Sequence, residues 1–478
     1  MIMMIMVMAA ATTAFADPLP SPRTGVQLTV KRDQAVADGL GKGYRFAVQR
    51  YENVHAVVPF RNAGKEKVRL RYQLTGNPDF TIDVPADGAF HDYELICGPV
   101  RKGEFLLSFE VPPGIEFGDL DFRKLETDEL PAGNELTILP PIARKRRVII
   151  RDVGYAPEKP GEADVLLWKG DAVAAATFTV DDNHVPEHPW WMELAAKYGA
   201  KITWFQIAEN IGVNNGRGPH GAWKDWKNVI ARGHDYQTHT FDHLHDRDMP
   251  IAECYRLGIE RNRENFPEHR ILCLAYPGGG QTAKNSCIEA AKQFICCRGA
   301  RPFPNEADAI NYTCTGSGHG DNTVEAATNR FGLANLVTRN PKFPQYYRAW
   351  NCYHCHNMPT QEMKDNVERA VKFFRDHGAW LAAYSEVARY GQERDTAKLE
   401  TLANGSDRIV LKLTDRMKDE LFDYPLSLVL RVPDGWKAAE VEQQGRKSVV
   451  EVKPRSGGAA LVFEAVPDRG EITVAKTR

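Results

Sequence analysis

Two adjacent carboxylates and two histidines four residues apart are the residues of this chain whose spacing could do chemistry. Asp181 and Asp182 end an apolar run over residues 173–180, and His239 and His243 follow about sixty residues later. Two imidazoles and one carboxylate bind a divalent metal and leave positions open for water and substrate oxygen. The other carboxylate stays free as a base, because adjacent acids repel unless a cation or a division of labour separates their roles. The pattern predicts a hydrolytic metal site.

Each pair taken alone also has an ordinary structural explanation. Adjacent acids often form a turn or cap a helix, and histidines spaced i, i+4 lie more often in a core or on a surface than on a metal. Residues 173–180 and 235–240, however, are both expected as strands of one sheet. Active sites of α/β folds lie at the carboxyl ends of such parallel strands. We expect the histidines to project from one face at the start of a helical turn, so the combination favours a site.

The elements that must position these residues form an alternating series between residues 170 and 392. Strand patterns occur at 173–180, 201–207, 235–240, 272–276, 294–298 and 380–384. Helical patterns occur at 189–198, 223–232 and 361–377. This alternation predicts an α/β domain with parallel strands.

The flanking segments have a different rhythm, with short runs that alternate apolar and polar residues. Residues 24–125 and 400–478 therefore predict two antiparallel β-sandwich domains, and the proline-rich range 126–169 predicts a linker. The stretch 118–125 resembles the last strand of jelly-roll modules found beside carbohydrate enzymes. The first sandwich is expected either to bind carbohydrate or to serve as a spacer. We assign no chemistry to the last one.

Length, charge and cysteine usage limit the remaining possibilities. The 478 residues predict two or three domains, and a net charge of -2 offers no reason to expect a nucleic-acid partner. Residues 1–16 predict a signal peptide that ends in Ala14-Phe15-Ala16, and hence a secreted or periplasmic protein. No later segment is apolar enough to cross a membrane. The nine cysteines are an odd number, for which buried thiols or one or two disulfides are expected rather than a zinc site at the C-x-x-C of Cys352 and Cys355.

Two motifs resemble those of the polysaccharide deacetylases, the NodB-homology carbohydrate esterases. The stretch T-F-T-V-D-D-N at residues 177–183 is similar to their first motif, T-F-D-D-G, and residues 233–243 are similar to their glycine-led H-x-x-x-H. The resemblance covers residues 170–392 and implies a distorted (β/α) barrel that acts on an acetylated carbohydrate. It implies Asp181 as the catalytic base. It implies a divalent metal, Zn²⁺ first and Co²⁺ or Ni²⁺ as alternatives, on the ligands Asp182, His239 and His243.

Two further motifs are less regular. Tyr276-Pro277-Gly278 lies where the family has R-P-P-Y-G, which implies substrate binding there and an oxyanion hole at the Gly278 N–H. The arginine that orients the base in the family is missing, so His234 or Asp235 is expected to replace it. Near the end of the domain, the resemblance implies a histidine as general acid, and we expect His356 in preference to His354.

Three functions remain open from the sequence. The first is a metal-dependent deacetylase of a polysaccharide or oligosaccharide, acting on N-acetyl or O-acetyl groups. The second is a metal-retaining carbohydrate-binding protein without activity, for which the missing arginine and Asn183 are the best support. The third is a C–N hydrolase of the same superfamily that acts on a small amide. The sequence implies no protein partner for any of them.

Overall fold

The computed structural model of the chain describes residues 28–48, 52–75, 80–100, 103–122, 137–139, 146–182, 184–244, 249–279, 287–319, 339–341 and 343–477. By its internal contacts the chain divides into two compact units, Met1–Lys124 and Leu125–Arg478. The predicted signal peptide, residues 1–16, lies outside the described residues. None of the helices in the described ranges has the length and apolar character needed to span a membrane.

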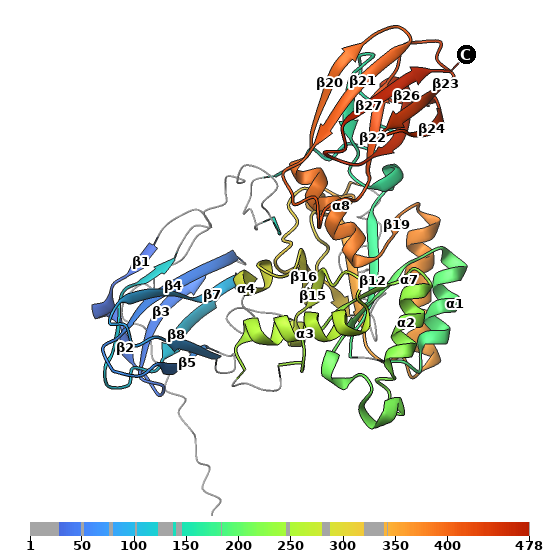
Figure 1. The fold of residues 1–478 in the computed structure, drawn as a ribbon. Helices are drawn as coiled ribbons and strands as arrows, with labels where there is room; N and C mark the ends of the chain where they lie inside the picture. Colours follow the sequence, from blue (N-terminus) through green and yellow to red (C-terminus); the bar gives the residue numbers. More distant parts are fainter. Residues whose placement is uncertain are drawn as a thin grey trace, which may run out of the picture. The chain divides into compact units, whose positions relative to one another are not determined.

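The first unit consists of two antiparallel five-stranded sheets (Figure 1). One sheet has the order β1-β10-β4-β7 with β9 paired to β4, and its strands are β1 (Leu28–Val30), β4 (Glu52–Asn62), β7 (Phe90–Val100), β9 (Ile115–Phe117) and β10 (Leu120–Phe122). The other has the order β2-β3-β8-β5-β6, and its strands are β2 (Val36–Ala37), β3 (Lys42–Val48), β5 (Val68–Leu74), β6 (Phe80–Val84) and β8 (Gly103–Phe109). The predicted antiparallel strands are therefore present.

Aromatic side chains connect the two sheets of the first unit. Phe60 of β4 meets Phe109 of β8 edge to face with ring centroids 5.1 Å apart, and Phe46 of β3 meets Phe122 of β10 at 5.0 Å. All four rings are buried. Alternate residues of these strands thus supply an apolar core, which the period-two pattern of the sequence predicts.

The second unit contains the predicted α/β domain. Its eight-stranded sheet has the order β16-β15-β14-β13-β12-β18-β17, with β19 paired to β12, and every pairing is parallel. The strands are β12 (Ala175–Val180), β13 (Ile202–Gln206), β14 (Asp235–Thr238), β15 (Cys273–Ala275), β16 (Cys296–Arg298), β17 (Gly318–His319), β18 (Trp350–Cys355) and β19 (Trp380–Leu381). Each predicted strand of the series is found within the range expected for it.

Helices follow the strands, as the alternating pattern predicts. They are α1 (His188–Tyr198), α2 (Trp223–Ala231), α3 (Ile251–Asn265), α4 (Cys287–Ala291), α7 (Gln361–Asp376) and α8 (Tyr384–Thr396). Thr360 caps α7, since its hydroxyl accepts a hydrogen bond from the Met363 N–H at 3.3 Å. The apolar face of α7 is buried in one cluster with residues of α1, α2 and the central strands. That cluster keeps the sheet rigid beneath its carboxyl edge.

Two further antiparallel sheets complete the second unit. One has the order β20-β21-β27-β23-β24 and consists of β20 (Lys398–Asn404), β21 (Arg408–Thr414), β23 (Ala438–Gln443), β24 (Arg446–Glu451) and β27 (Glu471–Lys476). The other has the order β11-β22-β26-β25 and consists of β11 (Ala163–Val165), β22 (Leu426–Arg431), β25 (Lys453–Arg455) and β26 (Gly458–Ala465). Strand β11 comes from the range 126–169, so part of the segment predicted as a linker is built into a sheet.

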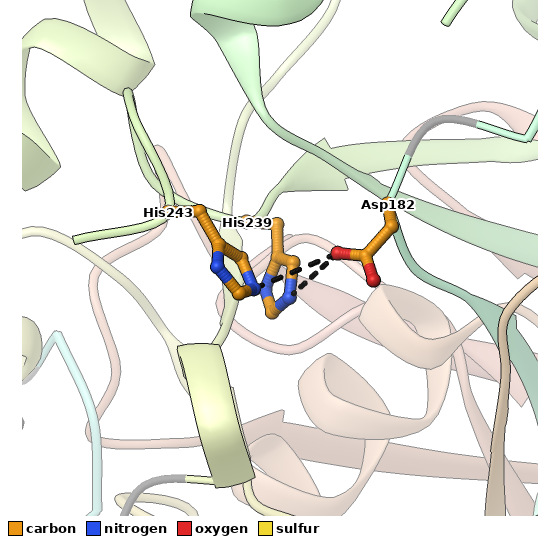
Figure 2. A group of neighbouring side chains, drawn as sticks. All are labelled: Asp182, His239 and His243. Atoms are coloured by element: carbon orange, nitrogen blue, oxygen red, sulfur yellow. Dashed lines mark ion pairs between the residues drawn. The ribbon is translucent and has the colours of Figure 1, made fainter. Parts of the chain in front are cut away.

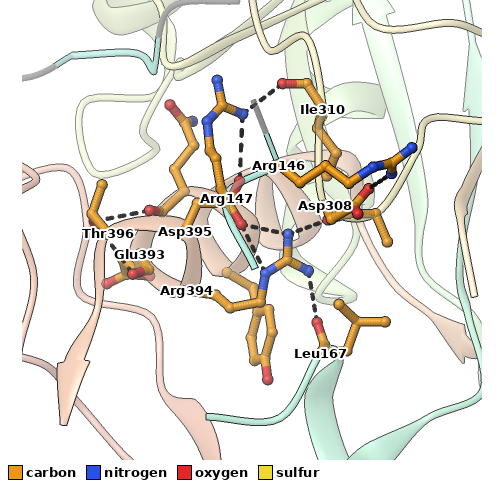
Figure 3. Close-up of polar contacts among 12 residues, drawn as sticks. Arg146, Arg147, Leu167, Asp308, Ile310, Glu393, Arg394, Asp395 and Thr396 are labelled. Carbon is orange, nitrogen blue, oxygen red and sulfur yellow. Dashed lines mark hydrogen bonds and ion pairs between the residues drawn. The ribbon is translucent and has the colours of Figure 1, made fainter. Parts of the chain in front are cut away.

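A buried polar network joins α8 to the segment that precedes the α/β domain (Figure 3). Arg394 pairs with Asp395 at 2.6 Å and donates to the Leu167 carbonyl at 2.8 Å. Arg147 lies 3.5 Å from the same Asp395 and donates to the Ile310 carbonyl at 2.9 Å. Buried charges are stable only when paired and hydrogen-bonded, so this network is structural.

The cysteines contribute to the core rather than to a metal site. Seven with described side chains are free and buried, namely Cys254, Cys273, Cys296, Cys297, Cys314, Cys352 and Cys355. Of the two expectations, buried thiols and disulfides, the first is therefore the one found for these seven residues. Burial raises the pKa of Cys254 to about 11, which keeps that thiol protonated and unreactive.

Candidate active site

The predicted metal ligands meet above the carboxyl ends of two strands of the parallel sheet (Figure 2). Asp182 follows β12, and His239 and His243 follow β14. One ligand atom from each lies within 4.8 Å of the others, and this is the one group of three metal-binding side chains found in the described part of the chain. The three predicted ligands are therefore distant in the sequence but lie next to one another at one sheet edge.

The geometry of the three side chains suits a shared cation. Asp182 Oδ1 lies 3.5 Å from His239 Nε2 and 3.6 Å from His243 Nε2, and the two imidazole rings are 4.8 Å apart at 69°. Asp182 Oδ1 is buried and accepts no hydrogen bond. Both nitrogens approach one oxygen from separate directions at distances too long for hydrogen bonds. A metal ion among them would satisfy all three atoms.

His239 is held as a neutral ligand. Its Nδ1 lies 2.8 Å from the Ala275 carbonyl oxygen at the end of β15. Because a carbonyl only accepts, Nδ1 carries the proton and the Nε2 lone pair faces Asp182. Burial, followed by repulsion from His243, holds the pKa of His239 well below its usual value. The ring is therefore neutral at physiological pH and ready to bind a cation.

A strained loop, not a helix, brings His243 back to the site. Residues 239–244 contain no helical turn, which corrects the expectation that the two histidines start one. Thr240 and His243 have φ of 74° and 61°, in the left-handed region that non-glycine residues seldom adopt. The Thr240 hydroxyl accepts the His243 N–H at 3.0 Å, and Asp242 Oδ1 accepts the Leu244 N–H at 2.8 Å. These bonds maintain a conformation that i, i+4 spacing alone does not specify.

Asp181 has a partner that the sequence analysis missed. Its Oδ2 forms a buried ion pair with Arg298 NH2, while its Oδ1 is buried and has no hydrogen-bond partner. The expected substitutes lie elsewhere: His234 Nδ1 faces the Ile202 N–H at 3.3 Å, and Asp235 Oδ2 accepts the Thr203 hydroxyl at 3.1 Å. Neither hydrogen bond reaches Asp181, so the expectation of His234 or Asp235 as the orienting residue is wrong. In the sequence, an arginine at the end of the apolar stretch 294–298 could have indicated this partner.

The two candidate general acids occupy different places. His356 follows β18, is partly exposed, and its Nε2 lies 3.7 Å from Asp182 Oδ2. His354 lies within β18, is buried, and pairs with the Ser317 hydroxyl at 2.9 Å. The His319 ring is tilted at 59° to that of His354, with ring centroids 4.3 Å apart. His356 therefore lies beside Asp182, whereas His354 is bonded to Ser317.

The remaining predicted residues follow β15 at the same edge. Gly278 is exposed and has φ 63°, a conformation that glycine adopts at little cost. Pro277 is buried beside it, and the chain continues into residues 280–286, which lie outside the described ones. Tyr276 is buried, with its hydroxyl donating to the Thr313 carbonyl at 2.8 Å. The side chains of Tyr276 and Pro277 are therefore buried, whereas Gly278 is exposed.

His184 is a second residue of this site that the sequence analysis did not single out. It follows the first motif and interacts electrostatically with both Asp182 and His356. Burial lowers its pKa, which favours the neutral ring. Its position two residues after Asp182 could have indicated, from the sequence, that it belongs to this site.

Part of this chain matches a known protein family. Residues 171–294 match the family model described as polysaccharide deacetylase. A gellan lyase from Bacillus sp is 32% identical over 380 residues, which cover 74% of this chain and 15% of that protein. This chain thus corresponds to only a small part of that relative's length.

Solved structures give a distant likeness. A family 4 carbohydrate esterase from Streptomyces lividans in complex with acetate has a TM-score of 0.30 and 11% identity, over 44% of this chain and 92% of that one. A CE4 family pseudoenzyme from Bacillus anthracis has a TM-score of 0.29 and 10% identity, over 45% and 65%. A likeness at this TM-score and identity does not assign a function to this chain.

Both motifs lie within the range that the family model matches. The chain contains a polysaccharide deacetylase domain, of the NodB-homology type that its motifs resemble.

Proposed function

We propose that this chain is a metal-dependent hydrolase that removes acetyl groups from a polysaccharide or oligosaccharide. The observation that carries the proposal is the convergence of Asp182, His239 and His243 beside a buried second carboxylate, Asp181. A simple metal-binding site needs only the first three residues. The fourth, held by an arginine, supplies a base for hydrolysis.

The donor set favours Zn²⁺, with Co²⁺ or Ni²⁺ as alternatives. Two imidazole nitrogens and one carboxylate oxygen are typical of catalytic zinc sites, which keep a position open for substrate or water. The hydrogen bond from His239 Nδ1 to the Ala275 carbonyl fixes the tautomer such a site requires. When bound, the metal would polarise the acetyl carbonyl and lower the pKa of a water molecule.

We assign the remaining steps of the hydrolysis to three groups of this chain. Arg298 holds Asp181 by Oδ2, which leaves the unpartnered Oδ1 to take the proton of the attacking water. The Gly278 N–H is assigned to the oxyanion of the tetrahedral intermediate. His356 gives a proton to the departing nitrogen or oxygen of the sugar, and its partial exposure lets it recharge from solvent.

An extended glycan is the substrate class that we favour. The matching family model describes polysaccharide deacetylases, and the relative named above is a gellan lyase. We infer that the domain is a distorted (β/α) barrel flanked by β-sandwiches, which suits a long substrate better than a small amide. Residues 1–16 favour a secreted or periplasmic protein, where such glycans occur.

The inactive alternative has two supports in the sequence, the missing family arginine and Asn183, which lies outside the described residues. Arg298 pairs with Asp181 from a different strand, and this pairing supports the active enzyme against the first of them. A protein that only binds has no need of the buried Asp181–Arg298 pair, because burying charged groups is costly.

Acetate release tests the proposal. The purified protein would be stripped with a chelator, reloaded with Zn²⁺ or Co²⁺, and incubated with N-acetylated and O-acetylated glycans. We expect release that disappears with the chelator and returns with the metal. Asp181→Asn is the matched control, because it should retain metal but not turnover. Glycan binding without acetate release by metal-loaded protein would contradict the proposal.

A further inference from the structure

Three imidazole rings gather beside the candidate active site, and the proposed reaction uses only one of them. The ring centroids of His319 lie 4.3 Å from those of His354 and 5.7 Å from those of His356. The rings of His354 and His356 are 5.9 Å apart. Aromatic rings at such separations interact favourably. His319 thus lies against the proposed general acid, although no step of the hydrolysis is assigned to it.

The place of His319 is fixed by a short strand. Strand β17 consists of Gly318–His319 and pairs in parallel with β18, so that His319 lies opposite His354. Residues opposite one another in a sheet point to the same face, which places the two rings side by side. The His354 ring is itself held, because its Nδ1 lies 2.9 Å from the Ser317 hydroxyl.

The chain just before β17 is anchored by side chains and backbone from elsewhere in the domain. Asn305 Oδ1 accepts the Gly316 N–H at 2.7 Å, and Asn305 Nδ2 donates to the Gly316 carbonyl at 3.1 Å. The Ser317 N–H donates to the Arg301 carbonyl at 2.6 Å. Both Asn305 and Ser317 are buried. Three hydrogen bonds over two consecutive residues therefore leave the segment that leads to His319 little freedom.

The orientation of the His356 ring depends on its neighbours. Its side chain is 30% exposed, and rotation of a histidine ring about its last torsion is soft. The His319 ring meets that of His356 at 33°, and the His354 ring meets it at 87°. One neighbour is inclined only slightly to the His356 ring and the other stands across it. A rotation of His356 would disturb at least one of these contacts.

The exposure of His319 argues against a purely structural role. His319 is exposed, whereas His354 and Ser317 are buried. An exposed side chain gains little from burial, and its truncation leaves no cavity in the core. The consequences of removing the His319 ring are therefore expected at the His356 ring rather than in the stability of the fold.

We propose that His319 is a positioning residue that fixes the His356 ring for proton transfer to the leaving group. The inference rests on the proposed function, in which His356 is the general acid, and deepens it. A general acid must lie within hydrogen-bond reach of the atom that it protonates, and a misplacement of about 1 Å can cost about a hundredfold in rate. His319 acts through the packing of its ring, so the shape of the side chain matters more than its nitrogens.

Two substrates separate this role from a general defect. The sugar nitrogen or oxygen needs a proton to depart, whereas the leaving group of nitrophenyl acetate departs as a stable anion and needs none. The zinc-loaded full chain is assayed on an acetylated glycan and on nitrophenyl acetate. The test variants are His319→Ala and His319→Phe. The matched control is His377→Ala, which removes another exposed imidazole, stacked on Phe373 at 4.0 Å at the end of α7.

We expect His319→Ala to lower kcat on the glycan by about tenfold, with KM, zinc content and the unfolding midpoint at the values of the control. The loss on nitrophenyl acetate should stay within about twofold. His319→Phe should recover most of the loss, because it keeps an aromatic ring. In a protein that carries His356→Ala, the added His319→Ala change should not lower kcat further. An equal loss on both substrates, or the same glycan kcat for His319→Ala and the control, would overturn the proposal.

An NMR measurement that needs no activity distinguishes a failure of this inference from a failure of the proposed function. The Cε1–H resonance of the His356 ring, assigned by its loss in His356→Ala, is compared among the zinc-loaded proteins. It should broaden in His319→Ala, as the ring samples several orientations, and stay sharp in His319→Phe. A wild type that released no acetate from either substrate would contradict the proposed function. An equally sharp His356 resonance in His319→Ala would overturn the positioning role whatever the activity.

Discussion

Arg298 and Asp181 form a buried ion pair across the parallel sheet although β13, β14 and β15 lie between their strands. Side chains at the ends of β16 and β12 could not touch in a flat sheet, since neighbouring strands are about 4.8 Å apart. The contact therefore requires the sheet to curl, which brings the two strand ends toward one another. Arg298, the partner of Asp181, thus comes from the strand after the third motif and not from the motif itself.

Replacing Arg298 should impair turnover without removing the metal. Arg298→Gln is expected to lower kcat by about a hundredfold or more, because Asp181 loses the buried partner that fixes its orientation. Arg298→Lys should recover part of the rate, since it keeps the charge but not the planar geometry. Bound zinc should stay at the wild-type level. In a protein that already carries Asp181→Asn, the added Arg298→Gln change should not lower kcat further. A wild-type kcat for Arg298→Gln alone would show that Arg298 does not act through Asp181.

Much of the fold was predictable because local patterns encode it. Strands β12 and β13 are buried along their whole length, so they stand out as largely apolar runs, and motif spacing places acids after β12 and histidines after β14. Asp182 and His239, which the structure brings together, were singled out in this way.

What the sequence did not reveal depends on long-range geometry. The Arg298–Asp181 contact spans 117 residues and exists only because the sheet curls. The return of His243 depends on positive φ values at Thr240 and His243, which no helical period predicts. The incorporation of β11 in the C-terminal sheet depends on its pairing with β22, more than 250 residues later. Local patterns carry no information on such contacts.

The two candidate general acids can be separated by mutation. His356→Ala should lower kcat by about 10²–10⁴-fold while the protein keeps its metal, because His356 faces the ligand group. His354→Ala should cost much less, since its ring is buried against Ser317 and His319. The measurement is kcat for acetate release together with zinc content. A larger loss for His354→Ala than for His356→Ala would reverse the assignment.

Asp242 should control metal affinity through the loop that carries His243. Its Oδ1 accepts the Leu244 N–H at 2.8 Å and the Cys254 thiol at 3.1 Å. Asp242→Ala is expected to weaken zinc binding by about 10–100-fold, as is typical when support behind a ligand is lost. Asp242→Asn keeps an accepting oxygen and should lie close to the wild type. Competition with a zinc-chelating dye measures both, and equal affinities for all three proteins would exclude the supporting role.

His188 should make the stability of this protein fall in mild acid. Its ring lies edge to face between Trp204 and Trp226, and burial lowers its pKa to about 4. The unfolded chain, with a histidine pKa of about 6.5, then binds the proton first, so stability is complete above pH 6.5 and is lost as pH falls toward 4. We expect this residue to cost about 2 kcal/mol between pH 7 and pH 5. Urea unfolding of metal-free protein at both pH values measures the loss. His188→Phe keeps the aromatic packing and should reduce it, and an identical loss in the variant would show that other groups cause it.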